Sequence, residues 1–182
     1  MIDLIDLEKS LLLPHVKKGG VAVDFTMGNG HDTLWLSEAV GDDGHVYAFD
    51  IQPQAIENTR ARLEEHGRKN CELICDSHSN VRNYVGEKIC AGMFNLGYLP
   101  GSDRKITTMR PSTMAAVTAA LELLGPDGGL LIAVYPGHEE GTLEGKMLDE
   151  FFAGLDRREI CVSKFRIVNS PTSPFFFLVE KK

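Results

Sequence analysis

The stretch that decides the fold class is Val21-Ala22-Val23-Asp24-Phe25-Thr26-Met27-Gly28-Asn29-Gly30-His31-Asp32-Thr33. Its first part is a short apolar run typical of a buried strand, and a segment with helical spacing begins directly after it. The two glycines suit a tight turn, because glycine adopts positive φ and lets the backbone approach a ligand closely. A strand, a glycine turn and a helix in immediate succession predict the first unit of an alternating α/β sheet.

Apolar runs of strand length recur along the chain, at residues 21–26, 46–51, 71–75, 91–96 and 130–135. They are nearly continuous rather than alternating, as in parallel strands that helices cover on both faces. Apolar stripes at helical spacing fill the gaps and predict a doubly wound, mostly parallel sheet. The stripes are Trp35, Leu36, Ala39 and Val40; Ile56 and Leu63 after Pro53; Met114, Val117, Leu121 and Leu124 after Pro111, with Gly125-Pro126 expected to end that helix; and Leu143, Met147 and Phe151.

The C-terminal part breaks this alternation. Residues 161–168 and 175–180 are β-rich, and the loop between them is too short for a crossover helix. The final strand pair is therefore expected to be antiparallel, completing seven strands. In the absence of an internal repeat, low-complexity tract or linker, residues 1–182 are expected to form one domain. The edge of the final strand pair could also support a homodimer.

Composition narrows the classes of partner. The 182 residues carry 19 basic and 26 acidic side chains, a formal net charge of -7, so no global positive field draws the chain to nucleic acid or anionic lipid. The four cysteines lack CxxC spacing, and no metal site is predicted. The N-terminal segment lacks the basic start and long apolar stretch of a signal peptide, and no membrane-length apolar segment follows. We expect a cytoplasmic location and no membrane partner.

The glycine turn predicts a nucleotide cofactor. Asp50 ends the second predicted strand twenty residues after Gly30, where a carboxylate can accept hydrogen bonds from ribose hydroxyls. The G-x-G-x-x-G motif that holds the diphosphate of a dinucleotide is absent, because Thr33 stands at the third glycine position. S-adenosylmethionine, which has no phosphates, therefore fits better than NAD, which remains the alternative. The expected cofactor contacts are Asp24, Thr26, Gly28, Asn29, Gly30, Asp32, Thr33, Asp50, Gln52, Asp76, Ser77, His78 and Asn95, of which Asp76, Ser77 and His78 would border the adenine. A tight turn with Asp32 or Thr33 as a helix cap is the structural alternative.

A second motif follows the fourth predicted strand and reads Asn95-Leu96-Gly97-Tyr98-Leu99-Pro100-Gly101. Ligands in this topology lie outside the carboxyl ends of the strands, so the loop is expected to face the cofactor. Its first four residues have the layout of the N-P-P-Y signature of amino-group methyltransferases. The Asn95 side chain and the Leu96 carbonyl would hold the N–H bonds of an amine so that its lone pair points at the methyl group. Tyr98 would form a wall or stacking face for the base, whereas a Gly-Pro turn with an edge tyrosine is the alternative.

These motifs, together with Tyr135-Pro136-Gly137-His138, resemble a bacterial family long labelled rRNA methylases, and the likeness covers almost the whole chain. The resemblance implies a class I, Rossmann-like methyltransferase fold. It also implies a tRNA methyltransferase that methylates the 5-aminomethyl group of 5-aminomethyl-2-thiouridine at the wobble position, giving 5-methylaminomethyl-2-thiouridine. Ser102 and Arg104 stand where the family has a glycine and a lysine, so the loop contacts differ while a positive charge is kept.

An alkylamine is mostly protonated at neutral pH, so the site must free its lone pair. His138 is the candidate proton acceptor, and with Asn95 and Tyr98 it completes the predicted catalytic set. Arg104, Lys105 and Arg110 form a local basic cluster for the anticodon loop of tRNA, with Lys164 and Arg166 as further candidates. The alternatives are another RNA, a small-molecule amine, or a module that binds the cofactor without catalysis. The predicted substrate contacts are Leu96, Tyr98, Pro100, Gly101, Arg104, Lys105, Arg110, Tyr135 and His138.

Overall fold

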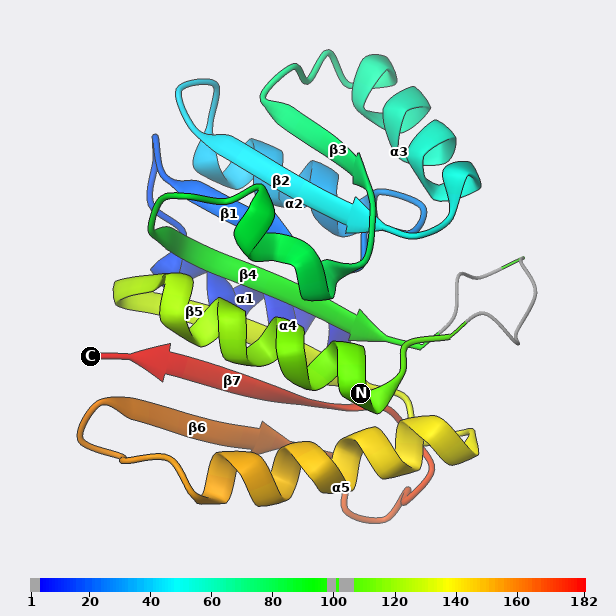
Figure 1. The fold of residues 1–182 in the computed structure, drawn as a ribbon, viewed down its shortest axis with the longest axis vertical. Coiled ribbons are helices and arrows are strands. Elements are labelled where there is room, and N and C mark those ends of the chain that lie inside the picture. The colour runs from blue at the N-terminus through cyan, green and yellow to red at the C-terminus, as the bar shows by residue number, and fades with distance from the viewer. Residues whose placement is uncertain (1–3, 98–100, 102–106) are drawn as a thin grey trace.

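The computed structural model describes residues 4–97, 101 and 107–182. Its strands form a single seven-stranded sheet in the order β3-β2-β1-β4-β5-β7-β6 (Figure 1). The strands are β1 Val21–Asp24, β2 His45–Asp50, β3 Cys71–Cys75, β4 Ile89–Leu96, β5 Leu124–Val134, β6 Ile160–Phe165 and β7 Phe175–Lys181. The first five are parallel to one another, whereas β7 runs antiparallel to both β5 and β6. This sheet confirms the predicted fold class, including the antiparallel final pair.

Helices cover both faces of the sheet, as Figure 1 shows. The helices are α1 Leu4–Leu12, α2 His31–Val40, α3 Pro53–Glu65, α4 Arg110–Leu123 and α5 Glu139–Ala153, with short 3-10 turns at Leu13–His15 and His78–Asn83. Leu12 of α1 and Leu36 and Val40 of α2 pack in one buried cluster with the sheet. Val117 of α4 and Leu148 of α5 belong to the larger cluster on the opposite face. The sheet is therefore buried on both sides, which explains its continuous apolar strands.

Three local features differ from the sequence prediction. Helix α1 was not predicted, although its leucines recur at helical spacing and pack against the sheet. Helix α4 ends at Leu123 and β5 begins at the next residue, so Gly125-Pro126 lies within the strand instead of ending the helix. This start of β5 is irregular: Asp127 has a φ of 59°, and the pairing with β4 shifts register.

The buried face of α5 also differs from the predicted stripe. Leu148 and Phe152 are the buried apolar residues, together with the carboxylate of Glu144. Met147 and Phe151 are only half-buried at the margin of the core. The buried stripe is therefore displaced by one residue from the predicted one, and it includes Glu144, which accepts hydrogen bonds from Thr108 and Thr113.

The topology locates the ligand-binding edge. β1 is paired with β2 on one side and with β4 on the other, so the chain changes direction across the sheet between β1 and β4. In open α/β sheets a crevice forms at such a reversal, outside the carboxyl ends of the strands. β6 lies at one edge of the sheet, which is the position that strand pairing with a second chain would require. The homodimer stays a prediction. In the described ranges, none of the helices has the length and apolar character needed to cross a bilayer.

Candidate cofactor and acceptor site

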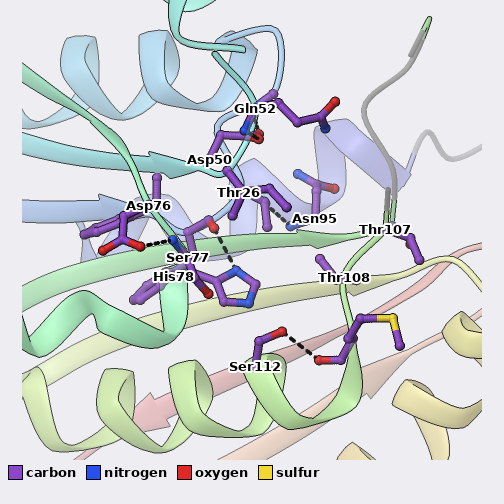
Figure 2. Close-up of a pocket in the computed structure, with 16 residues that line it drawn as sticks. Thr26, Asp50, Gln52, Asp76, Ser77, His78, Asn95, Thr107, Thr108 and Ser112 are labelled. Atoms are coloured by element: carbon purple, nitrogen blue, oxygen red, sulfur yellow. Dashed lines mark hydrogen bonds between the residues drawn. The ribbon is translucent and has the colours of Figure 1, made fainter. Parts of the chain in front are cut away.

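A pocket opens at the carboxyl ends of β1, β2, β3 and β4 (Figure 2). Figure 2 shows Asp50 and Gln52 along one rim, Asp76, Ser77 and His78 on a second side, and Asn95 near Thr107 on a third. The lining combines apolar rings with carboxylates and hydroxyls, as expected for a site that holds a polar ligand with a flat apolar part. The lining residues are Phe25, Thr26, Gly28, Phe49, Asp50, Ile51, Gln52, Asp76, Ser77, His78, Asn95, Gly97, Thr107, Thr108, Met109 and Ser112.

The glycine turn after β1 is built for close packing. Gly28 and Gly30 have φ values of 50° and 78°, which favour glycine. A Cβ on Gly30 would lie 2.8 Å from the Thr59 hydroxyl oxygen, so the absence of a side chain lets α3 pack against the turn. Asn29 accepts hydrogen bonds from Asn58 at its side chain and from Arg62 at its carbonyl, both at 2.8 Å. Gly28 lines the pocket, whereas Asn29 and Gly30 join the turn to α3.

Asp24, at the end of β1, supports the turn from below. Its carboxylate is buried and accepts hydrogen bonds from the Thr33 hydroxyl at 2.6 Å and the Thr26 backbone N–H at 3.1 Å. Burial and the nearby charge of Asp32 raise the pKa of Asp24 to about 7. Asp24 and Thr33 thus have each other as partners and do not line the pocket, and their predicted cofactor contacts stay predictions.

Asp50 lies on the pocket wall at the end of β2. Its carboxylate accepts hydrogen bonds from the backbone N–H groups of Gly28 at 3.1 Å and Gln52 at 2.9 Å. Burial raises the pKa of Asp50, and these donors oppose the rise. The structure therefore brings Asp50, Gln52 and Gly28 together, as the sequence predicted.

The end of β3 supplies the next wall. Asp76 accepts hydrogen bonds from the Asn80 amide and the Tyr84 hydroxyl, and these donors with the Ser77 N–H lower its pKa. His78 is buried, with its Nδ1 3.0 Å from the Phe25 carbonyl oxygen. Because a carbonyl only accepts, Nδ1 carries the proton. Burial lowers the pKa of His78, which keeps the ring neutral beside the pocket.

Asn95, near the end of β4, has partners on three sides. Its backbone N–H donates to the Thr26 hydroxyl at 2.7 Å. Its side-chain Nδ2 donates to Oδ2 of Asp32 at 2.5 Å, and its Oδ1 accepts from the Tyr135 hydroxyl at 3.2 Å. Lys9 forms an ion pair with the other oxygen of Asp32 at 3.0 Å. Asp32 contacts Asn95 and does not line the pocket, and its predicted contact with the cofactor stays a prediction.

The segment before α4 closes the pocket on its remaining side. The Thr108 hydroxyl donates to Glu144 at 2.9 Å, and the Thr113 hydroxyl donates to the same carboxylate at 2.5 Å. Glu144 is fully buried, and burial raises its pKa. Within the described residues, the buried Thr107 hydroxyl oxygen has no hydrogen-bond partner. Sequence reasoning missed this segment, Glu144 and Lys9, because isolated threonines, glutamates and lysines in helices and loops carry no distinguishing pattern.

The remaining predicted substrate residues have different positions. His138 caps α5, where its Nδ1 accepts a hydrogen bond from the Gly141 N–H at 3.1 Å. The neutral ring therefore carries its proton on Nε2, and its only basic nitrogen is the one that caps the helix. Arg110 forms an ion pair with Glu140 at 3.1 Å. Leu96 has a buried side chain, and Gly101 is exposed. Tyr98, Pro100, Arg104 and Lys105 lie outside the described residues. Of the two further basic candidates, Lys164 is paired with Asp149 at 2.6 Å, whereas Arg166 is exposed.

Comparison with protein families gives a match over residues 46–181 to the family described as "Putative rRNA methylase". The chain belongs to this rRNA methylase family. Family membership confirms the resemblance found in the sequence and the class of enzyme, a methyltransferase. The Rossmann-like sheet with antiparallel C-terminal strands agrees with solved methyltransferase structures that superimpose on this chain.

Solved structures of this kind superimpose over the full chain. A "putative rRNA-methylase" from Clostridium thermocellum is 34% identical, with a TM-score of 0.96 and coverage of 100% of this chain and 99% of that one. A methyltransferase from Streptococcus mutans, described as putative and solved in complex with SAH, is 38% identical, with a TM-score of 0.91 and the same coverage.

A plant relative carries a more specific name. The tRNA (mnm(5)s(2)U34)-methyltransferase, chloroplastic, of Arabidopsis thaliana is 36% identical over 178 residues, which is 92% of this chain. The alignment covers 65% of the plant protein, so the chain spans just under two thirds of that relative.

Proposed function

We propose that the chain transfers a methyl group from S-adenosylmethionine to the amine of 5-aminomethyl-2-thiouridine at the wobble position of tRNA, giving 5-methylaminomethyl-2-thiouridine. The observation that carries the proposal is the Asn95 amide, held beside the pocket at the end of β4 with its oxygen toward Tyr135. Identity to the plant enzyme along 178 residues supports the wobble uridine as acceptor. The SAH in the Streptococcus mutans relative supports the methyl donor.

The pocket fits this cofactor by the chemistry of its lining. Phe25 and Phe49 supply apolar walls for a flat base, and the Asp50 carboxylate suits ribose hydroxyls. Ser77 and His78 would border the adenine, and the Gly28 backbone would approach the amino-acid end. Gly28 has a positive φ and no Cβ, so its backbone can come close to the bound cofactor. When bound, the cofactor supplies a methyl group on a positively charged sulfonium.

The chain itself orients the acceptor. An amine reacts through its lone pair, so the N–H bonds must be held to the sides while the lone pair points along the line of transfer. Asn95 Oδ1 is a fixed hydrogen-bond acceptor for one N–H, and the Leu96 carbonyl is the proposed acceptor for a second. Tyr98, from the same motif, would pack on the base. This arrangement selects an acceptor with N–H bonds and an available lone pair.

The acceptor must also lose a proton, because a free alkylamine is mostly protonated at neutral pH. The pocket contributes by desolvation, since its apolar walls disfavour an ammonium ion. His138 remains the proposed proton acceptor, at Nδ1, and taking the proton there requires this nitrogen to release the Gly141 N–H that it holds in the structure. The proton lost by the amine would pass from there to solvent.

RNA would reach the pocket along the segment between β4 and α4. Arg104 and Lys105 are the proposed phosphate contacts, and Arg110 would join them when its pairing with Glu140 yields to a phosphate. Tyr135 is 39% exposed beside Asn95, which suits stacking on an unpaired base. Recognition of one splayed base explains how an acidic protein could act on RNA through a small basic cluster.

Ribosomal RNA is the second candidate acceptor, because the family description names it. Radiolabelled S-adenosylmethionine, offered with tRNA that carries unmethylated 5-aminomethyl-2-thiouridine, with rRNA, and with the free modified nucleoside, separates these acceptors. The proposal predicts rapid labelling of the tRNA alone. Labelling of rRNA or of the free nucleoside at an equal rate would replace it.

Calorimetric titration with SAH and with NAD tests the cofactor independently, and binding of NAD without SAH would overturn the methyl donor.

A further inference from the structure

The two ends of the Asn95 amide have different neighbours. Its nitrogen lies 2.5 Å from Oδ2 of Asp32, and its oxygen lies 3.2 Å from the Tyr135 hydroxyl. Asp32 comes from the first turn of α2, whereas Tyr135 directly follows β5. The register of the sheet places Leu96 opposite Val134, so Tyr135 emerges beside Gly97, and from there its hydroxyl reaches the Asn95 side chain. Two separate elements therefore meet at this one amide.

Chemistry allows only one orientation of the amide. A carboxylate accepts hydrogen bonds and donates none, so Asp32 must face the nitrogen of Asn95. A flipped amide would place two oxygens in contact and leave the NH₂ group facing the donor hydroxyl of Tyr135. Burial, with the negative charges of Glu8 and Asp32, raises the pKa of Tyr135 to about 12. Tyr135 therefore keeps its hydroxyl proton at neutral pH. A hydroxyl can donate or accept, so Asp32 sets the orientation of the amide, and Tyr135 donates to the oxygen that this orientation presents.

Among the residues that the structure describes, this orientation leaves one acceptor position of the Asn95 oxygen open. The Asn95 oxygen has two lone pairs, and the Tyr135 hydroxyl uses one. The backbone of Asn95 is fixed as well, because its N–H donates to Thr26 at 2.7 Å. The second lone pair is therefore presented from a rigid strand end. Such an acceptor can hold an N–H bond of an incoming amine in a constant direction.

Lys9 fixes the carboxylate in turn. Its ammonium lies 3.0 Å from Oδ1 of Asp32, and the two side chains are 23% and 18% exposed. The same ammonium lies 5.9 Å from the centre of the Trp35 ring. Each oxygen of Asp32 thus has its own donor, one from α1 and one from β4. The N-terminal helix is in this way connected to the acceptor site.

We propose that Asp32 and Tyr135 are positioning residues, which act through Asn95 by fixing its amide with the oxygen toward the acceptor amine, and that Lys9 holds Asp32 for this purpose. The inference rests on the proposed function and assigns Asp32 to the acceptor side of the site instead of the cofactor side. An acceptor amine with an N–H bond is the class of substrate that this geometry recognises.

Asp32→Asn is the discriminating variant. An asparagine offers one oxygen to two donors, the Lys9 ammonium and the Asn95 amide. The charged ammonium forms the stronger hydrogen bond, so the new NH₂ group faces Asn95 and favours the flipped amide. We expect kcat for the methylated acceptor to fall about 10- to 100-fold, as for a hydrogen bond to a charged group. Tyr135→Phe should lower kcat by about three- to tenfold. SAH affinity should stay within about twofold in both variants, since neither residue lines the pocket.

A double-mutant cycle with Asn95→Ala tests whether Asp32 acts through Asn95. The proposal predicts that Asp32→Asn causes no further loss of kcat once Asn95 is alanine. Independent, multiplicative losses would overturn it, and so would a large loss of SAH affinity in Asp32→Asn alone. The cycle uses whichever acceptor the wild-type protein methylates, so failure of the tRNA proposal is seen separately, in the wild type.

A second readout needs no catalysis. In ¹⁵N-labelled protein, the side-chain NH₂ signal of Asn95, assigned by its loss in Asn95→Ala, should shift strongly in Asp32→Asn and little in Lys69→Ala, an exposed lysine between α3 and β3. An unchanged Asn95 signal in folded Asp32→Asn protein would show that Asp32 does not set the orientation. Thermal unfolding of each variant confirms that the protein compared is folded.

Discussion

The carboxylate of Asp50, at the end of β2, accepts a hydrogen bond from the backbone N–H of Gly28 at 3.1 Å. This contact joins the glycine turn to the neighbouring strand at the wall of the pocket. The same carboxylate faces the position proposed for the ribose. Asp50 therefore has two roles that can be measured together, one in shaping the turn and one in binding the cofactor.

Asp50→Ala should weaken SAH binding by roughly tenfold or more, because a hydrogen bond to a charged group is lost and the turn loses a support. Asn95→Ala should leave SAH affinity largely intact and lower kcat, because Asn95 is proposed to orient the acceptor. Calorimetry and steady-state kinetics on both variants check this division. Asp43→Ala, an exposed aspartate before the other end of β2, is the control. Equal losses of SAH affinity in Asp50→Ala and Asn95→Ala would contradict the division.

Gly30 and Gly67 provide a matched pair for the packing of the turn. Both have positive φ, 78° and 64°, but a Cβ at Gly30 would lie 2.8 Å from Thr59 whereas a Cβ at Gly67 meets nothing within 4 Å. Gly67→Ala should cost only the backbone strain, about 1 kcal/mol of unfolding free energy. Gly30→Ala adds overpacking and should cost roughly 2 to 5 kcal/mol. Urea unfolding measures both, and equal costs would show that α3 does not constrain the turn.

Asp24 should make stability depend on pH. Its pKa rises from 3.8 to about 7 on folding, so the folded state binds this proton more tightly than the unfolded chain. The resulting stabilisation is present below the unfolded pKa and is lost as pH rises through the folded pKa. The unfolding free energy of wild type minus that of Asp24→Asn should therefore fall between about pH 4 and about pH 7. A difference that rises or stays constant over this range would contradict the assignment.

Arg104 and Lys105 test the RNA surface. If both contact phosphates, replacing them with alanine should weaken tRNA binding and reduce the slope of log K against log salt by roughly one to two, because fewer counterions are released. SAH affinity should be unchanged. The control is Arg157→Ala with Arg158→Ala, two exposed arginines before β6 at the opposite end of the sheet. An unchanged salt slope in the Arg104 and Lys105 variant would place the RNA elsewhere.

The sequence predicted the features of the fold and of the pocket that depend on local patterns of residues. Continuous apolar runs and a glycine turn indicated the strands and the edge of the sheet where the pocket lies, and Asp50 and Asp76 both line that pocket. Polar residues in the turn were harder to interpret: Asn29 and Asp32 are predicted cofactor contacts, and in the structure they have Arg62 and Lys9 as partners. Those partners come from other elements, and no spacing in the chain reveals them. The features of the site that the sequence did not predict depend on contacts that form only when these elements pack together.

The most direct test of the central claim is mass spectrometry of nucleosides from tRNA treated with the protein. The tRNA should carry 5-aminomethyl-2-thiouridine and be incubated with S-adenosylmethionine, with the Asn95→Ala variant in parallel. The account predicts that wild type converts this nucleoside to 5-methylaminomethyl-2-thiouridine, a gain of one methyl group, and that the variant does so much more slowly. Wobble nucleoside that stays unmethylated, while the same preparation of protein methylates rRNA or a free amine, would contradict it.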